Sequence, residues 1–318
     1  MNPPFTISSK TLGLVSRIER MIGRLESFDH PAPQPQLRKS NRVRTLHGSL
    51  GIEGNTLSQD QITAILENKP VIAPKNEILE ILNANAAYEI LGDLDPLNKD
   101  QLLEAHGIMM RDLIQDAGRW RSGDVGILKQ GKVSHLAPPA NRVPYLMTDL
   151  FDFLKGEDHP LIQGAVFHYE FEFIHPFSDG NGRVGRFWHS LMLYNFHPVF
   201  EYIPLESVVK TYQQDYYQVL ETCDNLGEST RFIEFSLQMI EQALDEFLEL
   251  FRPTKITPND RISSAQRHFK SHWFTRKAYM SLHREISSAT ASRDLKSGIA
   301  RKLLESQGEK ATTKYRFL

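Results

Sequence analysis

The stretch "HPFSDGNGRVGR", residues 175–186, lies between an apolar, aromatic-rich segment and a second apolar segment. Gly180 and Gly182 flank Asn181, and glycine allows a positive φ and the close approach of a ligand to the backbone. Successive N–H groups in such a loop can form an anion-binding nest. Helical spacing resumes at about Arg183, so we expect the nest at a helix N-terminus, where the helix dipole also favours an anion. The stretch therefore predicts a phosphate site.

Charged side chains in the same stretch extend this prediction to a polyphosphate. Arg183 and Arg186 are three residues apart and share a helix face, so both can donate charge-assisted hydrogen bonds to phosphate oxygens. Asp179 would repel a phosphate unless Mg²⁺ lay between them, and a nucleotide-bound Mg²⁺ takes one or two carboxylates. His175, with an ordinary pKa of about 6.5, can accept a hydroxyl proton as general base. These residues together predict a phosphoryl-type transfer.

Length and composition bound the class of protein. The chain has 318 residues, of which 40% are hydrophobic, which is enough for about two domains with a sizeable core. Residues 1–23 do not have the pattern of a signal peptide, and no run approaches the roughly 18 apolar residues of a membrane span. We therefore expect a cytoplasmic protein without a membrane partner. Cys223 is the single cysteine, which excludes an internal disulfide.

Apolar periodicity predicts a mainly α-helical fold. Helical spacing runs through residues 77–117, 144–155, 161–174, 183–196, 207–222 and 229–251. The Pro-rich segment 29–36 ends an N-terminal helix, because proline removes a donor and disfavours helix before it. Residues 125–136 have β-branched residues on both sides of "KQGK", which predicts a hairpin that turns at Gly131. Residues 252–260, "RPTKITPND", predict a linker.

The charge is unevenly distributed along the chain. Residues 255–318 contain 14 Lys or Arg against 5 Asp or Glu, whereas residues 1–254 contain 23 against 34. This basic C-terminal part predicts an anionic partner, with a basic solvated surface as the alternative. A helix from Thr290 to Leu304 followed by a glycine-turned pair of short strands looks like a winged helix-turn-helix with that helix as recognition helix. DNA and protein partners both stay open, because winged helices also serve as docking modules.

A second motif lies upstream, in "SLGIEGN", residues 49–55. Ser49 and Glu53 are four residues apart and share a helix face, and Gly54–Asn55 predicts the helix end. The spacing is not that of a capping box, which needs three residues. From these residues alone, the segment is a helix with an exposed glutamate and a glycine cap.

The stretch 175–186 resembles the signature of the Fic family, His-Pro-Phe-x-Asp/Glu-Gly-Asn-Gly-Arg-x-x-Arg, at each fixed position. The resemblance covers about residues 10–250 and implies transfer of AMP from ATP to a Ser, Thr or Tyr hydroxyl of a target protein, with release of pyrophosphate. It implies that His175 is the base for the hydroxyl, that Asp179 holds Mg²⁺ and that Phe177 anchors the loop. It also implies five phosphate-binding residues: Gly180, Asn181, Gly182, Arg183 and Arg186.

Three further segments are similar to parts of that family. The hairpin 125–136 looks like its flap, which holds a target segment by adding it as a strand. Tyr217, in "YYQVLE", resembles an adenine contact, with core packing as the alternative. The segment 49–55 resembles the inhibitory motif Ser/Thr-x-x-x-Glu-Gly/Asn, which implies that Glu53 enters the active site, pairs with Arg186 and makes ATP binding unproductive.

The sequence thus predicts a mainly α protein with a Fic-type helical core, a β-hairpin flap and a small C-terminal winged helix-turn-helix domain. The expected parts are a helical region at 1–75 with an inhibitory helix at about 45–54, the catalytic core at 76–251, the linker 252–260 and the winged-helix-like domain 261–318. The expected function is autoinhibited AMP transfer, with self-modification also open. The alternatives are removal of AMP, another transfer at the same site, and a DNA-binding regulator that senses a nucleotide.

Overall fold

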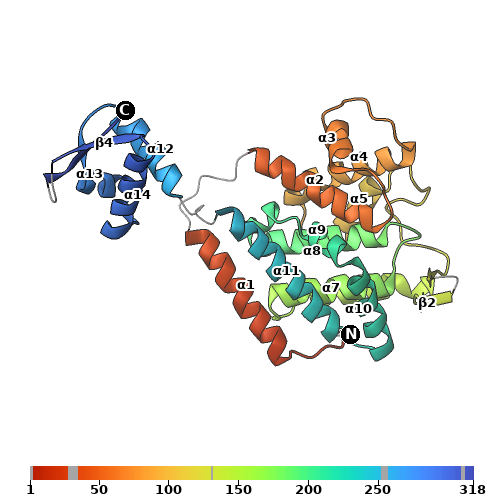
Figure 1. The fold of residues 1–318 in the computed structure, drawn as a ribbon. Helices are drawn as coiled ribbons and strands as arrows, with labels where there is room; N and C mark the ends of the chain where they lie inside the picture. Colours follow the sequence, from red (N-terminus) through yellow and green to blue (C-terminus); the bar gives the residue numbers. More distant parts are fainter. Residues whose placement is uncertain (1–2, 28–34, 130–131, 252–256, 309–311) are drawn as a thin grey trace. The chain divides into compact units, whose positions relative to one another are not determined.

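The computed structural model describes residues 3–27, 35–129, 132–251, 257–308 and 312–318, which Figure 1 colours along the chain. The chain divides into two compact units, Met1–Leu250 and Phe251–Leu318. Three predicted features lie wholly or partly outside the described residues: the Pro-rich segment 29–36, the turn at Gly131 and the linker 252–260. Among the described residues, no helix is long and apolar enough to cross a membrane.

The first unit is mainly α-helical, which confirms the predicted fold class. Its α-helices among the described residues are α1 (Ser9–Ser27), α2 (Pro35–Ile52), α3 (Gln59–Leu66), α4 (Lys75–Glu89), α5 (Lys99–Met109), α6 (Val143–Phe153), α7 (Pro160–Ile174), α8 (Asn181–Phe196), α9 (Leu205–Thr211), α10 (Gln213–Leu226) and α11 (Thr230–Phe251). Short 3-10 helices are η1 (Leu91–Asp93), η2 (Ala140–Arg142) and η3 (Pro198–Tyr202). Strands β1 (Gly126–Lys129) and β2 (Lys132–Leu136) pair antiparallel, with Ile127 opposite His135.

Helices α7 and α8 pack against each other at the centre of this unit (Figure 1). The first part of α7 is buried on all sides, because apolar residues surround the helix instead of forming one stripe. The aromatic side chains of Phe167, Phe171 and Trp188 in these two helices have no exposed surface. The stretch 175–186 connects α7 to α8, so two buried helices hold both of its ends.

Helix α2, which contains the predicted inhibitory segment, packs against α9 at backbone distance. A Cβ placed on Gly48 would lie 2.6 Å from the carbonyl oxygen of Glu206 and from the amide nitrogen of Ser207. Only glycine allows two backbones to approach this closely. Asn41, two turns earlier, donates from Nδ2 to the carbonyl oxygen of Tyr202 (2.6 Å). The core therefore holds α2 at points two turns apart.

Two of the predicted helical ranges are interrupted. In the range 77–117, α4 ends at Glu89 and α5 begins only after Asn98, whose Oδ1 accepts a hydrogen bond from the Asp100 N–H (3.0 Å) and caps the helix. The range 207–222 is broken at Tyr212, whose φ of −104° and ψ of 31° are not helical. The spacing of apolar residues does not detect such breaks, because helices on both sides bury the same kind of side chain.

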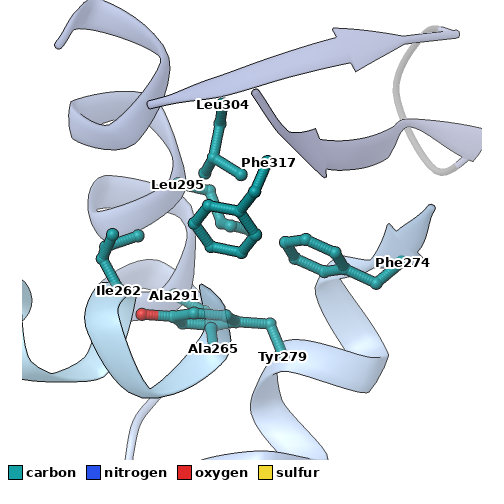
Figure 2. Close-up of a cluster of buried hydrophobic side chains, with 8 residues drawn as sticks. All are labelled: Ile262, Ala265, Phe274, Tyr279, Ala291, Leu295, Leu304 and Phe317. Atoms are coloured by element: carbon teal, nitrogen blue, oxygen red, sulfur yellow. The ribbon is translucent and has the colours of Figure 1, made fainter. Parts of the chain in front are cut away.

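The second unit has a hydrophobic core of its own (Figure 2). Its elements are α12 (Pro258–Phe269), β3 (Phe274–Thr275), α13 (Arg276–Leu282), α14 (Ser288–Ala300), β4 (Leu304–Gln307) and β5 (Lys314–Phe317). Strand β5 pairs antiparallel with both β3 and β4. The buried side chains of this core are Ile262, Ala265, Phe274, Tyr279, Ala291, Leu295, Leu304 and Phe317.

The predicted recognition helix has different limits in the structure. Helix α14 begins before Thr290, because the side chain of Ser287 accepts a hydrogen bond from the Thr290 N–H (3.2 Å) and caps the helix. It ends at Ala300 and not at Leu304, which begins β4 and is buried in the core. The order helix, strand, helix, helix, strand, strand agrees with a winged helix-turn-helix, an assignment that stays a prediction.

Candidate active site

The loop between α7 and α8 starts with a residue in the left-handed conformation. His175 has φ 49° and ψ 61°, and its N–H donates to the carbonyl oxygen of Phe171 (2.9 Å). This conformation is uncommon for a residue with a Cβ. The chain then directs Phe177 into the core, where its ring stacks on that of His106 with 3.6 Å between centroids. The buried ring anchors the loop, while His175 stays partly exposed.

Helix α8 begins at Asn181, two residues earlier than predicted. Gly180 has a positive φ of 86° and forms the N-cap. Gly182 lies inside the helix and does not have a positive φ. Of the two glycines, Gly180 is therefore the one that adopts the expected left-handed backbone conformation. The first N–H groups of a helix have no intrahelical acceptor, and Val184 makes the first such bond, to the carbonyl oxygen of Gly180 (3.0 Å). These donors and the helix dipole make the α8 N-terminus a site for an anion.

The side chain of Asn181 closes the loop. Its Oδ1 accepts a hydrogen bond from the N–H of Phe177, and its Nδ2 donates to the carbonyl oxygen of the same residue, both at 2.9 Å. The side chain is buried together with these partners. Asn181 could offer a phosphate its backbone N–H or its side-chain amide. The side-chain amide is already bonded to Phe177, so the backbone N–H remains.

A carboxylate from the end of α2 lies beside the first turn of α8. A Cβ placed on Gly182 would overlap Glu53 Oε1 and would lie 3.0 Å from Arg186 Nη1. Glycine is therefore required at this position for an anion to approach the helix. In the structure, the Glu53 carboxylate lies directly against Gly182.

Arg186 brings together the two motifs that the sequence singles out. Its Nη2 donates to Glu53 Oε1 (2.6 Å) and to the carbonyl oxygen of Ser49 (3.0 Å), and its Nε donates to Ser49 Oγ (3.3 Å). The Arg186 side chain is 2% exposed and that of Glu53 is 32% exposed. Burial alone would lower the pKa of Arg186, but the Glu53 carboxylate contributes to raising it above its ordinary value. The charged pair therefore stabilises a cation that is otherwise buried.

Two carboxylates hold Arg183. Its Nη2 lies 3.1 Å from Asp179 Oδ1, and its Nη1 lies 3.1 Å from Glu80 Oε1. The N–H of Gly180 also donates to Asp179 Oδ1 (2.6 Å). The Asp179 side chain is 61% exposed, so it supports the loop and is accessible from solvent as well.

The residues at this site fit a Mg²⁺ ion that arrives with a nucleotide. Among the described residues, no group of three or more His, Cys, Asp or Glu side chains could hold a metal ion alone. Nucleotide-bound Mg²⁺ keeps several waters and needs one or two carboxylates, which the accessible Asp179 can supply. Two buried donors, Arg183 Nε and Arg186 Nη1, have no hydrogen-bond partner in the described part of the chain. They can serve the phosphate oxygens of such a nucleotide.

Side chains from α9 and α10 hold the C-terminal end of α2. Lys210 Nζ donates to the carbonyl oxygen of Gly51, and Gln213 Nε2 donates to that of Ile52 (2.9 Å). The Tyr217 hydroxyl also donates to the carbonyl oxygen of Ile52 (3.2 Å). The last carbonyls of a helix lack intrahelical i+4 donors, and these three side chains donate to the carbonyls of Gly51 and Ile52, the former of which also accepts a hydrogen bond from the Gly54 N–H (3.3 Å).

Tyr217 is not the core residue of the "YYQVLE" segment. It is 38% exposed, whereas its neighbour Tyr216 is buried with its hydroxyl 3.1 Å from His168 Nε2. Burial, together with the nearby Glu53 carboxylate, raises the pKa of the Tyr217 hydroxyl. Tyr217 thus lies next to Glu53, and its role as an adenine contact stays a prediction.

The turn after Glu53 is tied to α4 by contacts that the sequence analysis missed. Asn55 Nδ2 donates to Glu80 Oε2 (2.8 Å), and the N–H of Thr56 donates to Glu77 Oε2 (2.7 Å). Because the other oxygen of Glu80 pairs with Arg183, one carboxylate connects this turn to the 175–186 stretch. A helical carboxylate 25 residues away carries no sequence signal for such a contact.

His106 is a second residue that the sequence analysis missed. Its Nδ1 accepts a hydrogen bond from the Gly118 N–H (2.8 Å), so the proton is assigned to Nε2, which lies 3.0 Å from the carbonyl oxygen of Asp179. Burial lowers its pKa, which favours this neutral form. In the sequence, His106 stands at an apolar position of a helical pattern, and nothing there distinguishes it from a core residue.

Comparison with known proteins identifies the family. A family model described as Fic/DOC matches residues 96–193. A Fic family protein from Desulfovibrio desulfuricans, known from a crystal structure, is 37% identical to this chain, with all of this chain and 98% of that chain covered and a TM-score of 0.77. The chain belongs to the Fic family.

Curated relatives carry a more specific name. Protein adenylyltransferase fic-1 of Caenorhabditis elegans is 29% identical over 265 residues, which are 76% of this chain and 50% of the relative. Protein adenylyltransferase Fic of Culex quinquefasciatus is 28% identical over 263 residues, 77% of this chain and 50% of the relative. The chain thus spans about half the length of these two relatives.

Proposed function

We propose that this protein transfers AMP from ATP to a Ser, Thr or Tyr hydroxyl of a target protein and releases pyrophosphate. The N-terminus of α8 carries the proposal, because Gly182 allows an anion to approach there and Arg183 and Arg186 each keep a buried donor beside it. A single phosphate could be bound by the N–H groups of the helix N-terminus alone. Two arginines beside that N-terminus can bind further phosphates, so the site suits a polyphosphate. The names of the curated relatives support the same reaction.

In this reaction His175 acts as general base. It accepts the proton of the target hydroxyl while the hydroxyl oxygen forms a bond to the α-phosphorus. The bond from the α-phosphorus to the oxygen that bridges to the β-phosphate breaks, and pyrophosphate leaves with the electron pair. The position of His175 supports this role, since it is partly exposed and its left-handed turn begins the loop that would bind the α-phosphate.

The phosphates are bound by backbone and side chains of the same stretch. The N–H groups of Asn181 and Gly182 at the start of α8 receive the α-phosphate, and that of the N-cap Gly180 joins them when it leaves Asp179 Oδ1. Arg183 and Arg186 donate to the outer phosphates. Mg²⁺ held by Asp179 supplies, when bound, charge neutralisation on the phosphates. Positioning and electrostatic stabilisation dominate phosphoryl transfer, so these groups and the base together are sufficient for the reaction.

Glu53 inhibits the reaction in our proposal. Its carboxylate lies against Gly182 and pairs with Arg186, which removes this arginine from the outer phosphates and sets a negative charge beside the triphosphate. ATP can then bind only in a pose whose α-phosphate is misaligned for attack. Ser49 contributes by accepting a hydrogen bond from Arg186 Nε, which holds the guanidinium toward α2.

We assign the target segment to the β1–β2 hairpin, which forms a two-stranded sheet among the described residues and offers its outer strand edges to a further strand. An extended peptide could add to such an edge as a third strand. The protein's own hydroxyls are also candidate acceptors, and self-modification would be visible without a known target.

Labelled ATP tests the proposed reaction. Incubation with ATP labelled at the α-phosphorus should label protein, whereas γ-labelled ATP should not, because pyrophosphate leaves. His175→Ala should abolish the label, and His272→Ala, in the other unit, is the matched control. Label from γ-labelled ATP would instead mean phosphate transfer. If wild type removes label from prelabelled protein faster than it adds it, AMP removal with Glu53 orienting a water is the better assignment.

A groove in the second unit favours a second candidate function, the binding of duplex DNA. The groove has a volume of about 750 Å³. Among the described residues, its lining contains three basic residues, five hydroxyl residues, one methionine and no acid: Thr275, Arg276, Lys277, Met280, Ser281, Arg284, Ser288, Thr313 and Tyr315. Two acids of this unit are already neutralised, since Asp294 pairs with Arg261 and Glu305 with Arg316. The positive charge at the groove is therefore available for a phosphate backbone.

Fluorescence anisotropy with a labelled DNA duplex tests this candidate. Replacement of Arg276 and Arg284 by Gln should weaken binding at low salt and reduce the slope of log K against log salt by about 1.8, because each phosphate contact contributes about 0.9. The matched control replaces the exposed Arg267 of α12 and the exposed Lys270 that caps its C-terminal end by Gln and should have no effect. Absent or salt-insensitive binding would favour a protein partner.

A further inference from the structure

Arg121 is buried, and backbone carbonyl groups accept its hydrogen bonds. The residue is 3% exposed. Its Nε donates to the carbonyl oxygen of His175 (2.7 Å), and its Nη2 donates to that of Ile174 (3.3 Å). Its Nη1 donates to the carbonyl oxygen of Gly123 (2.9 Å), and Nη2 also reaches that of Pro138. One guanidinium thus binds carbonyls from segments more than 30 residues apart in the sequence.

These carbonyls are not neutralising groups, so charge pairing does not explain why the arginine is there. The carboxylate of Asp124 lies 4.0 Å from Nη1 and is 74% exposed, which makes it a weak partner. Burial lowers the pKa of Arg121. An unpaired buried cation is costly unless its hydrogen bonds are satisfied, and here the carbonyl groups satisfy them. The Arg121 side chain therefore serves to hold backbone segments in place.

The two held segments are the ones that the proposed reaction must bring together. Ile174 and His175 form the end of α7 and the left-handed turn that carries the base. Gly123 and Pro138 lie just before and just after the β1–β2 hairpin. The N–H of Arg121 adds a further bond, to the carbonyl oxygen of Pro176 (2.9 Å).

We propose that Arg121 is a positioning residue for the transfer, which sets the distance between the base and the segment that receives the target. The inference rests on the proposed function, in which His175 is the base and the hairpin holds the target. The fixed plane of the guanidinium with its five donors is what holds two segments at once, so a lysine cannot replace it. Among the described residues, Arg121 makes no hydrogen bond to the first turn of α8. Arg121 should therefore affect the rate of transfer and leave nucleotide binding alone.

The test compares Arg121→Lys and Arg121→Met with wild type in the full chain. Mg-ATP affinity from calorimetry should stay within twofold. Transfer at saturating ATP should fall by about a hundredfold, the loss that a displacement of about 1 Å of a reacting group can cause. The matched control is Gln163→Met, which removes another buried side chain that holds loop carbonyls, those of Leu154 and Gly156. That variant should transfer at the wild-type rate.

Hydrogen exchange keeps the inference testable if Arg121→Met fails to fold or if wild type shows no transfer. In Arg121→Lys, amides of residues 123–126 and of Ile174, His175 and Phe177 should exchange faster than in wild type, while those of α8 stay protected. Transfer within threefold of wild type in Arg121→Lys would overturn the inference. So would an equal loss of ATP affinity and transfer, or unchanged exchange in both segments. A failure of the proposed function would appear differently, as no transfer in wild type with the exchange pattern intact.

Discussion

Replacement of Glu53 by Gly should raise AMP transfer, although removal of a carboxylate from an active site would ordinarily lower activity. In the wild type, a triphosphate must compete with Glu53 for Arg186, whose Nη2 lies 2.6 Å from Glu53 Oε1. Without the carboxylate, the arginine is available to the outer phosphates and the concavity at Gly182 is empty. The α-phosphate can then bind in line with the attacking hydroxyl.

The geometry of the pair sets the size of the effect. A hydrogen bond between charged groups contributes about 1.5–3 kcal/mol. Arg186 is 2% exposed but Glu53 is 32% exposed, so solvent screens the pair and the lower part of that range applies, about 1.5–2 kcal/mol. With about 1.4 kcal/mol for each tenfold change in rate, transfer should rise about 10- to 30-fold.

A time course of autolabelling with α-labelled ATP measures this rise. The variants are Glu53→Gly, Arg186→Ala and the double variant, and both chains without Arg186 should be inactive, because the arginine is then missing from both states. Glu67→Gly is the matched control, since Glu67 is also an ion-paired glutamate at a helix end but lies outside the site. Transfer by Glu53→Gly at or below the wild-type rate would refute the inhibitory role.

Three further predictions concern the same unit. His175→Ala should keep Mg-ATP affinity while it abolishes transfer, and Asp179→Ala should weaken Mg-ATP binding itself; calorimetry on both separates the roles, and equal losses would contradict them. Asn55→Ala should raise autolabelling severalfold, because it releases the turn after Glu53 from α4, with no further rise in a Glu53→Gly background. Burial lowers the pKa of His189 to about 4. As the pH falls from about 6.5 to about 4, the unfolded chain therefore binds a proton at this residue that the folded chain does not, and the wild type should lose stability. Denaturant unfolding should show the free energy of unfolding of the wild type falling with pH relative to that of His189→Gln, and the same pH dependence in both proteins would contradict this assignment.

The sequence was most informative where function depends on local spacing. The α8 N-terminus and the helical pair Arg183 and Arg186 follow from residues a few positions apart. The sequence predicts Asn181 as a phosphate-binding residue but does not predict that its side-chain amide closes the loop by bonding to Phe177, four residues away. Leu304 was assigned to a helix because a buried residue has the same apolar character in a helix and in a strand.

Residue spacing does not predict contacts between distant segments, and the pairing of Glu53 with Arg186 was expected only from the family resemblance. Arg121 binds backbone carbonyls 53 and 54 residues away, and every residue has a carbonyl, so no residue type marks the acceptors. Glu80 connects Asn55 with Arg183 from a helix whose pattern shows only an ordinary charged position. The roles of such residues can be recognised only in the folded structure, where their partners lie next to them.

The backbone contact at Gly48 has a consequence for the speed of the proposed inhibition. Because α2 cannot shift along α9 without breaking that contact, the proposed release of Arg186 would proceed by rotation of the Glu53 side chain. Rotations of exposed side chains take picoseconds to nanoseconds, whereas helix shifts take microseconds to milliseconds. At a typical turnover of about 10 per second, the carboxylate samples both positions many times between two transfers. The proposed inhibition would then be an equilibrium between two positions of the carboxylate, so labelling should begin without a lag and the fraction of active molecules should rise with ATP concentration.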